Sequence, residues 1–290
     1  MVYWLMANPK AGEEGSRGAD FWRKHLEAAG ISGIRDCSLA DTGWTGEIAA
    51  RDILLAAGGD GSVNAAAALC LESGATLAVL PSGTANDFAR NLGLPEDPRK
   101  ICDLVSAGRT RKVDVAVARQ GMFLNVAHIG LGTLPVREPS GEAKRFLGRF
   151  SYVAALLQKL SAYRGFHGRI ETRAGNVTGR WLTIAVSSGA FFGGGNEIPE
   201  ASAGDGQLDV IAVRPRSMFQ LLLTFITVRL SRSSPKRTST VVHLKSPEVR
   251  VITRSPKTIT MDGEIAGKTP LDAKCRPACL EVICEELVTT

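Results

Sequence analysis

The sequence predicts an α/β protein in two parts, a parallel-sheet domain followed by a domain built mainly of strands. In the first part, short β-rich runs alternate with alanine-rich helical stretches, and most of these are followed by glycine. After Lys112 the chain changes to many short strands separated by turns. Alternating strands and helices are typical of a parallel sheet covered on both faces. Serial strands joined by turns favour a β-sandwich.

The elements of the first part follow from periodicity and from the residues that stop each run. Phe21, Trp22 and Leu26 have helical spacing, and Gly30 ends that helix. The run that ends at Gly58 has the apolar composition of a buried strand. The predicted strands are 2–7, 52–57 and 76–80, and the predicted helices are 18–29, 63–71, 86–92 and 99–107.

The second part is predicted to hold eight strands interrupted by two helices. The strands are 113–118, 122–127, 168–173, 181–187, 208–213, 240–244, 248–253 and 258–261, and the helices are 146–162 and 218–230. We expect a first domain over 1–120, completed by the C-terminal segment 277–290, and a second domain over 121–276. A chain of 290 residues has the length of about two domains.

Net charge, apolar runs and cysteine content limit the kinds of ligand and location that the chain can have. The net charge of +6 and pI of about 9.1 suit nucleic acid, anionic lipid or phosphorylated ligands. We find no apolar run of ~18 residues, so no transmembrane helix is expected. The N-terminal apolar run is too short for a signal peptide. Six scattered cysteines without a second matched pair indicate reduced thiols rather than a zinc site, and we expect a cytoplasmic protein.

Three glycine-containing turns follow three of the predicted strands, at 8–12, 58–62 and 81–87. Ligands of open α/β sheets bind outside the carboxyl ends of the strands, so these turns are expected to line one crevice. Glycine lets the backbone approach a ligand, and N–H groups at a helix start bind phosphate. The alternative is plain turns, with Asp60 or Ser62 as an N-cap and a capping box formed by Thr84 and Asp87.

Asp60 distinguishes the second turn from a simple phosphate-binding loop. A carboxylate beside a phosphate is repelled unless a divalent cation lies between them, so the pattern favours a nucleotide with Mg²⁺. The sequence contains neither a Walker A loop nor a dinucleotide fingerprint.

Two acidic residues, Asp262 and Glu264, follow a late strand and flank Gly263. A carboxylate in a cleft can orient a hydroxyl group and accept its proton during phosphoryl transfer. The alternative is that this segment is simply a hairpin turn.

Taken in order, the segments 8–12, 58–62, 83–87, 205–209 and 262–264 resemble the diacylglycerol kinase catalytic domain family, whose relatives include sphingosine and ceramide kinases. The resemblance covers essentially the whole chain. It implies a nucleotide-binding domain similar to NAD kinase and phosphofructokinase, a β-sandwich domain, and an active site in the cleft between them. The chain departs from the family pattern at Ala65, where Glu is usual, at Ser62, where Thr is usual, at Thr133, and in a shortened 41–51 segment.

The resemblance assigns roles residue by residue. The residues implied to hold ATP are Asn8, Pro9, Lys10, Ala11, Gly12, Gly58, Gly59, Gly61, Ser62, Val63, Asn64, Gly83, Thr84 and Asn86. Those implied to organise the Mg-ATP site are Asp60, Asp87 and Asp114. Those implied to form a structural Mg²⁺ site are Asp205 and the backbone carbonyls near Ser202 and Gln207. Glu264 matches the general base, and Asp262 is the second catalytic residue beside it.

We therefore expect a Mg-ATP-dependent lipid kinase that acts on a diacylglycerol-like hydroxyl and yields phosphatidic acid. The alternatives are a nicotinamide-nucleotide kinase and a non-catalytic lipid- or nucleotide-binding regulator. The sequence leaves open monoacylglycerol, a sphingoid base, phosphatidylglycerol and an undecaprenol-like alcohol.

The partner is expected to be a membrane surface, bound transiently, and not nucleic acid. A homodimer is also compatible with the sequence. Residues 219–228 with Arg229 and Arg232 could dock on anionic lipid, although a helix packed on the sandwich explains them as well. A second candidate rim consists of Arg137, Lys144, Arg145 and Arg149.

Overall fold

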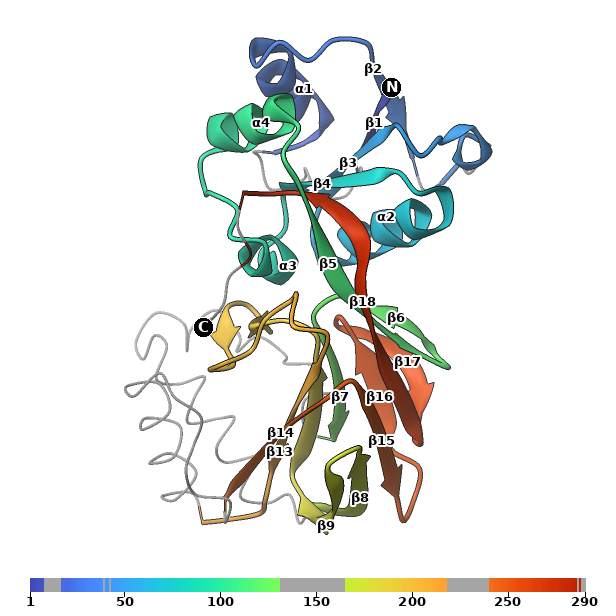
Figure 1. Ribbon diagram of the computed structural model, residues 1–290, viewed down its shortest axis with the longest axis vertical. Coiled ribbons are helices and arrows are strands. Elements are labelled where there is room, and N and C mark those ends of the chain that lie inside the picture. The colour runs from blue at the N-terminus through green and yellow to red at the C-terminus, as the bar shows by residue number, and fades with distance from the viewer. Residues whose placement is uncertain are drawn as a thin grey trace, which may run out of the picture.

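Two long strands run through both parts of the protein and join them. The computed structural model describes residues 1–7, 17–38, 40–41, 43–130, 165–217, 240–285 and 287. In Figure 1, β5 (Thr110–Ala118) and β18 (Leu271–Ile283) descend from the upper part into the lower part. They pair antiparallel over most of their length, with a register break between Arg276 and Leu280. The first glycine turn, the predicted helices 146–162 and 218–230, and both candidate membrane segments lie outside the described residues.

The upper part is the predicted α/β domain. Its parallel strands run in the order β2 (Ile34–Cys37), β1 (Tyr3–Ala7), β3 (Ile53–Gly58) and β4 (Thr76–Pro81). The C-terminal end of β18 extends this sheet, because Val282 pairs parallel with Leu77 of β4. All six residues of β3 are buried, as expected for a parallel strand covered on both faces.

Helices cover both faces of this sheet. Helices α1 (Ala19–Ala28) and α4 (Pro98–Ala107) pack on one face, and α2 (Asp60–Ser73) and α3 (Asp87–Asn91) pack on the other. The short 3₁₀ helix η2 (Thr45–Glu47) precedes β3. Helix α4 shows how the sequence defines such elements: the Asp97 carboxylate accepts from Arg99 N at 2.9 Å, Pro98 opens the first turn, and Gly108 ends the helix at φ 63°.

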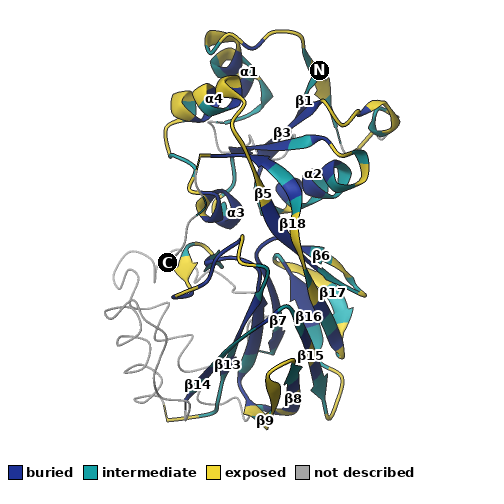
Figure 2. Ribbon diagram, viewed as in Figure 1, coloured by how far each residue is buried: buried dark blue, intermediate teal, exposed yellow. Residues whose placement is uncertain are grey.

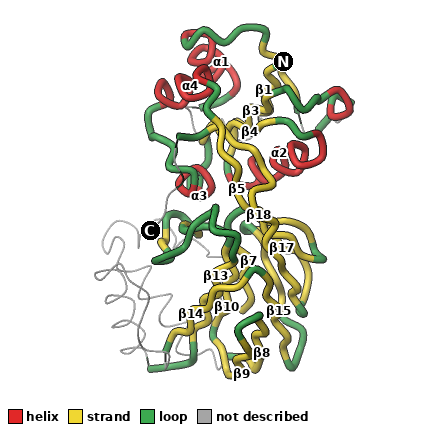
Figure 3. The backbone as a smooth tube through the Cα atoms, in the orientation of Figure 1, coloured by secondary structure: helices red, strands yellow, loops and turns green. Residues whose placement is uncertain are grey.

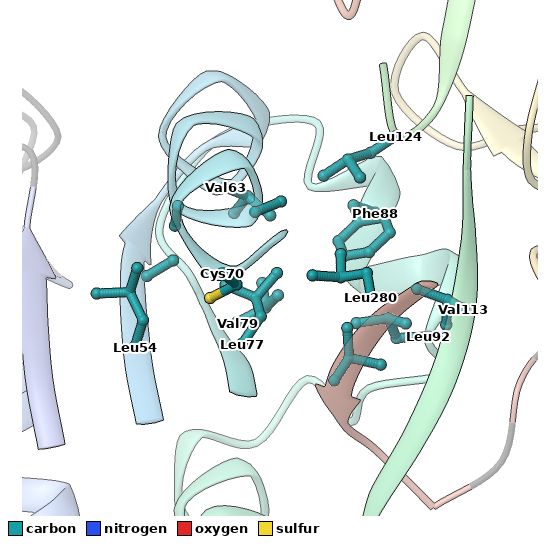
Figure 4. Packing of buried hydrophobic residues seen from close by; sticks show 14 of the residues in the cluster. Leu54, Val63, Cys70, Leu77, Val79, Phe88, Leu92, Val113, Leu124 and Leu280 are labelled. Carbon is teal, nitrogen blue, oxygen red and sulfur yellow. The ribbon is translucent and has the colours of Figure 1, made fainter. Parts of the chain in front are cut away.

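The core between α2, α3 and the sheet also includes the start of the second part. Val63 and Cys70 of α2 face Leu54 and Leu77 of the strands. Figure 4 shows Phe88 of α3 next to Leu124, which belongs to the segment that leads into the lower part. The first core therefore also anchors the segment that joins the two parts.

The lower part is a sandwich of two sheets. One sheet has the order β14 (Val241–Ser246), β13 (Leu208–Val213), β10 (Thr183–Ser187), β7 (Val126–Gly130), β16 (Thr258–Met261) and β17 (Glu264–Lys268). The other continues the upper sheet through the first part of β18 into β15 (Glu248–Thr253), β8 (Phe166–Thr172) and β9 (Gly175–Trp181), with β6 (Gly121–Phe123) beside β5. A small hairpin of β11 (Phe191–Phe192) and β12 (Asn196–Glu197) lies apart.

Apolar side chains from both sheets fill the space between them. The centre is formed by Trp181, Ile170, Ile184, Val210 and Val251, each with no exposed surface. Figure 2 shows this interior as buried strands surrounded by exposed loops. Among the described residues, every helix belongs to the first part and the lower part consists of strands and loops (Figure 3). The predicted combination of α/β domain and β-sandwich is confirmed.

Most predicted strands and helices are present, with one informative error. Strands β15 and β16 have the predicted bounds. The single strand predicted over 122–127 is instead two, β6 and β7, because Leu124 and Asn125 interrupt it. Strands β2, β9, β11, β12, β17 and β18 were not predicted. Within the described ranges, no helix is long and apolar enough to cross a membrane.

Trp181 provides a test of the sandwich core. It is fully buried and its indole Nε1 donates to the Gly168 carbonyl at 3.0 Å. Trp181→Ala is expected to lower the free energy of unfolding by about 3–5 kcal/mol, measured by urea titration, because it leaves a cavity and an unpaired carbonyl. Trp44→Ala is the control: this half-buried ring stacks on Trp4, and its loss should cost clearly less. Equal losses for the two variants would contradict the assignment of Trp181 to the core.

Candidate active site

The second and third glycine turns meet at the carboxyl edge of the parallel sheet. Gly58 ends β3 beside Pro81 of β4, and Ser82 N donates to the Gly58 carbonyl at 3.0 Å. The backbones then touch, since a Cβ on Gly83 would lie 2.6 Å from the Cα of Gly59. Only glycine fits at position 83 without moving the neighbouring turn. The second and third turns thus form one continuous backbone surface.

The N-terminus of α2 opens from this surface. Gly59 is the N-cap, and no side chain caps the helix, so the N-cap alternative for Asp60 and Ser62 is wrong. Uncapped N–H groups of a 14-residue helix, together with its dipole, form a site suited to phosphate. Gly61 is exposed there, while Ser62 and Val63 are buried.

Asp60 faces away from its own helix. Its Oδ1 accepts hydrogen bonds from Phe88 N at 3.1 Å and from Asn125 Nδ2 at 3.2 Å. Among the described residues, Oδ2 of Asp60 has no hydrogen-bond donor. Asp60 therefore ties α2 to α3 and to the segment that leads into the lower part, with one oxygen left for a ligand.

The third turn is closed by Asn86 and not by a capping box. Asn86 adopts φ 51° as the N-cap of α3, its Oδ1 accepts from Gly83 N at 3.0 Å, and its Nδ2 donates to Gly83 O at 2.7 Å. Helix α3 begins at Asp87, so the Thr84–Asp87 capping box is wrong. Thr84 is exposed on the turn and available for contact.

Asp87 reaches across to the lower part. Its carboxylate accepts from Gly194 N at 2.9 Å and from Gly195 N at 2.8 Å, in the turn between β11 and β12. Burial raises the pKa of Asp87, the two N–H groups oppose this rise, and the nearby Asp60 charge adds to it. This carboxylate joins the two parts and also adds negative charge beside Asp60.

Asp262 occupies the turn of the β16–β17 hairpin, at φ 46°, with Gly263 at φ 92°. Its Oδ2 accepts from Asn64 Nδ2 at 2.8 Å and from Leu124 N at 2.7 Å. Its Oδ1 accepts from Asn125 N at 3.0 Å and from Val126 N at 2.9 Å. Burial raises the pKa of Asp262, and these four donors oppose the rise. Asp262 therefore links α2 of the upper part to the segment that enters the lower part, and its role as the second catalytic residue stays a prediction.

Glu264 begins β17, immediately beyond that hairpin, and is exposed. Its Oε1 lies 3.6 Å from the position of a Cβ on Gly61. The predicted base thus faces the N-terminus of α2 from the opposite part of the protein. The hairpin alternative and the functional prediction apply to the same segment, because the hairpin carries Glu264 to the cleft.

Asp114 does not take part in this group. It is buried in β5, where Oδ2 accepts from Gly206 N at 2.6 Å and Oδ1 accepts from Ala278 N at 2.8 Å. Its carboxylate joins the 201–207 loop to the irregular point of β18. Both oxygens of Asp114 therefore accept backbone hydrogen bonds, and its expected part in organising a nucleotide site stays a prediction.

The predicted Mg²⁺ site near Asp205 does not fit a divalent cation. Asp205 Oδ1 accepts from Gln207 N at 3.0 Å, and Oδ2 accepts from the ammonium group of Lys245 at 2.8 Å. The described residues contain no group of three or more His, Cys, Asp or Glu side chains that could hold a metal, and the predicted site itself has one carboxylate and backbone carbonyls. Ser202 is buried in the same loop. The ammonium group of Lys245 thus pairs with the carboxylate that the resemblance assigns to the ion.

Two side chains of this site, those of Asn125 and Asn91, were not predicted. Asn125 is 3% exposed, and its Oδ1 accepts from Asn91 Nδ2 at 3.0 Å. Asn91 also donates to and accepts from the Phe191 backbone, at 3.2 and 2.8 Å. A lone Asn within the apolar run 122–127 and the three consecutive glycines 193–195 are the sequence signals that could have indicated a polar junction and a close backbone approach.

Comparison with known proteins agrees with this geometry. The family model of the diacylglycerol kinase catalytic domain matches residues 2–118, and that of the YegS C-terminal NAD kinase beta sandwich-like domain matches residues 126–284. A protein of Bacillus subtilis (strain 168) named diacylglycerol kinase is 27% identical over 92% of this chain and 90% of its own length. A protein of Pseudomonas savastanoi pv. phaseolicola named as a probable YegS-like lipid kinase is 31% identical, with 79% and 74% covered.

Two further comparisons concern length and fold. The chain covers about half of an uncharacterised Synechocystis protein, with 30% identity over 79% of this chain and 54% of that one. The crystal structure of a Bacillus anthracis str. Sterne diacylglycerol kinase superposes with a TM-score of 0.76 at 25% identity, covering 98% of this chain and 97% of that one. The chain therefore belongs to the diacylglycerol kinase family, among the lipid kinases that carry a YegS-type C-terminal domain.

Proposed function

We propose that this protein transfers the γ-phosphate of Mg-ATP to the hydroxyl group of a lipid. The observation that carries the proposal is the position of Glu264, an exposed carboxylate of the lower part that faces the uncapped N-terminus of α2. The helix start offers N–H groups for phosphate, and the carboxylate can accept a proton from an attacking hydroxyl.

Each group at the cleft has a role in such a transfer. The two touching glycine turns and the α2 N-terminus would hold the phosphates, and the free oxygen of Asp60 would face the metal of the nucleotide. Asp262 and Asn125 would keep Glu264 at a fixed position relative to these turns. Phosphoryl transfer depends mainly on positioning and charge stabilisation, which this arrangement can supply.

A diacylglycerol-like lipid is the proposed acceptor, with phosphatidic acid as product. Support comes from the Bacillus subtilis relative, which is named diacylglycerol kinase and matches 92% of this chain. Such an acceptor is embedded in a bilayer, so we propose that the protein works while bound transiently to a membrane surface. Its net charge of +6 favours anionic lipid.

Glu264→Gln tests the chemistry. The variant is expected to lower kcat by about 10²–10⁴-fold, since an amide cannot accept the proton. The measurement is transfer of labelled phosphate from ATP to lipid in mixed detergent–lipid micelles with Mg²⁺. The free energy of unfolding should change by less than about 0.5 kcal/mol, because the side chain is exposed.

Asp262→Asn distinguishes the role of Asp262 from that of Glu264. The variant is expected to lower the free energy of unfolding by about 1–3 kcal/mol, because the new NH₂ group would face backbone N–H donors that the carboxylate now satisfies. If Glu264→Gln retained full transfer, the base would be another group. If the wild type bound ATP but labelled no lipid, a non-catalytic regulator would replace the proposal.

Gly83→Ala tests the nucleotide surface. A Cβ there would lie 2.6 Å from Gly59 Cα, so the two turns must separate and ATP affinity should fall at least about tenfold, roughly 1.4 kcal/mol. Titration calorimetry with a non-hydrolysable ATP analogue measures it. Gly46→Ala is the matched control, because its Cβ would meet no atom within 4 Å, and its affinity should match wild type. Unchanged binding by Gly83→Ala would exclude these turns from the nucleotide site.

A further inference from the structure

The ammonium group of Lys245 lies among oxygen atoms of Asp205, Asp209 and Glu200 in the lower part. Lys245 Nζ lies 2.8 Å from Asp205 Oδ2 and 3.9 Å from Asp209 Oδ1, and it donates to the carbonyl of Glu200. The side chains of Lys245, Asp205 and Asp209 are 30%, 26% and 1% exposed. Three oxygens from three different residues thus surround one positive charge.

The position of Lys245 is fixed by the sheet. Lys245 of β14 is directly opposite Asp209 of β13 in the antiparallel register, so the two side chains emerge on the same face. Asp209 Oδ1 also contacts His243 Nε2 at 2.6 Å. Burial lowers the pKa of Lys245, but the hydrogen bond that Lys245 donates to Asp205 and the charges of Asp209, Asp205 and Glu200 outweigh this effect and raise the pKa. Lys245 therefore remains charged.

This arrangement competes with a divalent cation for the same oxygens. Mg²⁺ requires about six oxygen ligands at ~2.1 Å and is held by carboxylates, carbonyls and water. Here Asp205 Oδ2 and the Glu200 carbonyl already accept from Lys245, and Asp205 Oδ1 accepts from Gln207 N. A divalent ion bound to Asp205 would also be repelled by the ammonium.

The loop that carries Asp205 is hydrogen-bonded to the two strands that join the parts of the protein. Gly206 N donates to Asp114 Oδ2, and Asp114 N donates to the Ala203 carbonyl at 2.9 Å. Asp114 also accepts from Ala278 N, at the irregular point of β18. The 201–207 loop is thereby fastened to β5 and β18, the two strands shared by both parts.

We infer that the ammonium of Lys245 replaces the structural divalent cation in the second domain, so that this domain and its junction with β5 and β18 fold without a bound metal. The inference does not depend on kinase activity. It also implies that removing the ammonium leaves Asp205 and Asp209 as an unbalanced acidic pair that a divalent cation can then stabilise.

The test is the thermal stability of the full chain without nucleotide, in EDTA and in millimolar Mg²⁺. Wild type is expected to melt within about 1 °C in both conditions, since an ion that does not bind the native state does not shift Tm. Lys245→Met is expected to lower Tm by roughly 3–8 °C in EDTA and to recover at least half of that loss in Mg²⁺. Lys245→Met with Asp205→Asn should not recover.

Lys274→Met is the matched control. Lys274 lies 3.6 Å from Glu248 on an open surface and is 73% exposed, so its removal should not create a response to Mg²⁺. A wild-type Tm that rises in Mg²⁺ and falls in EDTA would overturn the inference, as would Lys245→Met that shows no recovery. If Lys245→Met does not fold, the metal content of dialysed wild type decides: stoichiometric divalent metal would refute the replacement, and its absence would support it.

Discussion

The four hydrogen bonds to Asp262 are the constraint on which the arrangement of the cleft depends. One comes from Asn64 on α2 of the upper part, and three come from consecutive backbone N–H groups at 124–126, where the chain enters the lower sheet. A carboxylate with this set of donors is costly to displace, because each donor would be left buried without a partner. Glu264 is two residues away, so the same bonds fix its distance from the start of α2.

A second polar network, formed by Asn125, Asp60, Asn91 and Asp87, lies beside the hydrogen bonds to Asp262. Asn125 donates its backbone N–H to Asp262 and its side-chain Nδ2 to Asp60, and its Oδ1 accepts from Asn91 Nδ2. Asp87 then joins α3 to the turn at 193–195. Asp60, Asp87, Asp262 and Asn125 each accept at least one hydrogen bond from a donor of the other part of the protein. Such satisfied networks are sensitive to small displacements, which favours one relative position of the two parts.

The sequence predicts the elements whose signals are local. Strands β15 and β16 alternate cleanly and end at turn residues, and the glycine turns follow buried strands. Strand β18 was missed because Pro277 and several polar residues interrupt its pattern, although pairing with β5 stabilises it. The role of Asn125 depends on Asp60, which is 65 residues away, and on Asp262, which is 137 residues away. No local pattern contains that information.

The acidic pairs Asp205–Asp209 and Asp60–Asp87 differ in how their negative charge is balanced, and this difference bears on where a cation from outside the chain would bind. Asp205 and Asp209 face the ammonium of Lys245. Asp60 and Asp87 both accept hydrogen bonds from backbone N–H groups, and Asp60 also accepts one from the side-chain amide of Asn125. Arg90 lowers the pKa of Asp87, but its effect is the smallest of those that act on this carboxyl group. Neutral donors stabilise a carboxylate but do not cancel its charge. In the proposed function a nucleotide adds further negative charge beside Asp60 and Asp87, and the Mg²⁺ of the proposed Mg-ATP would balance it, whereas Asp205 and Asp209 face the ammonium of Lys245.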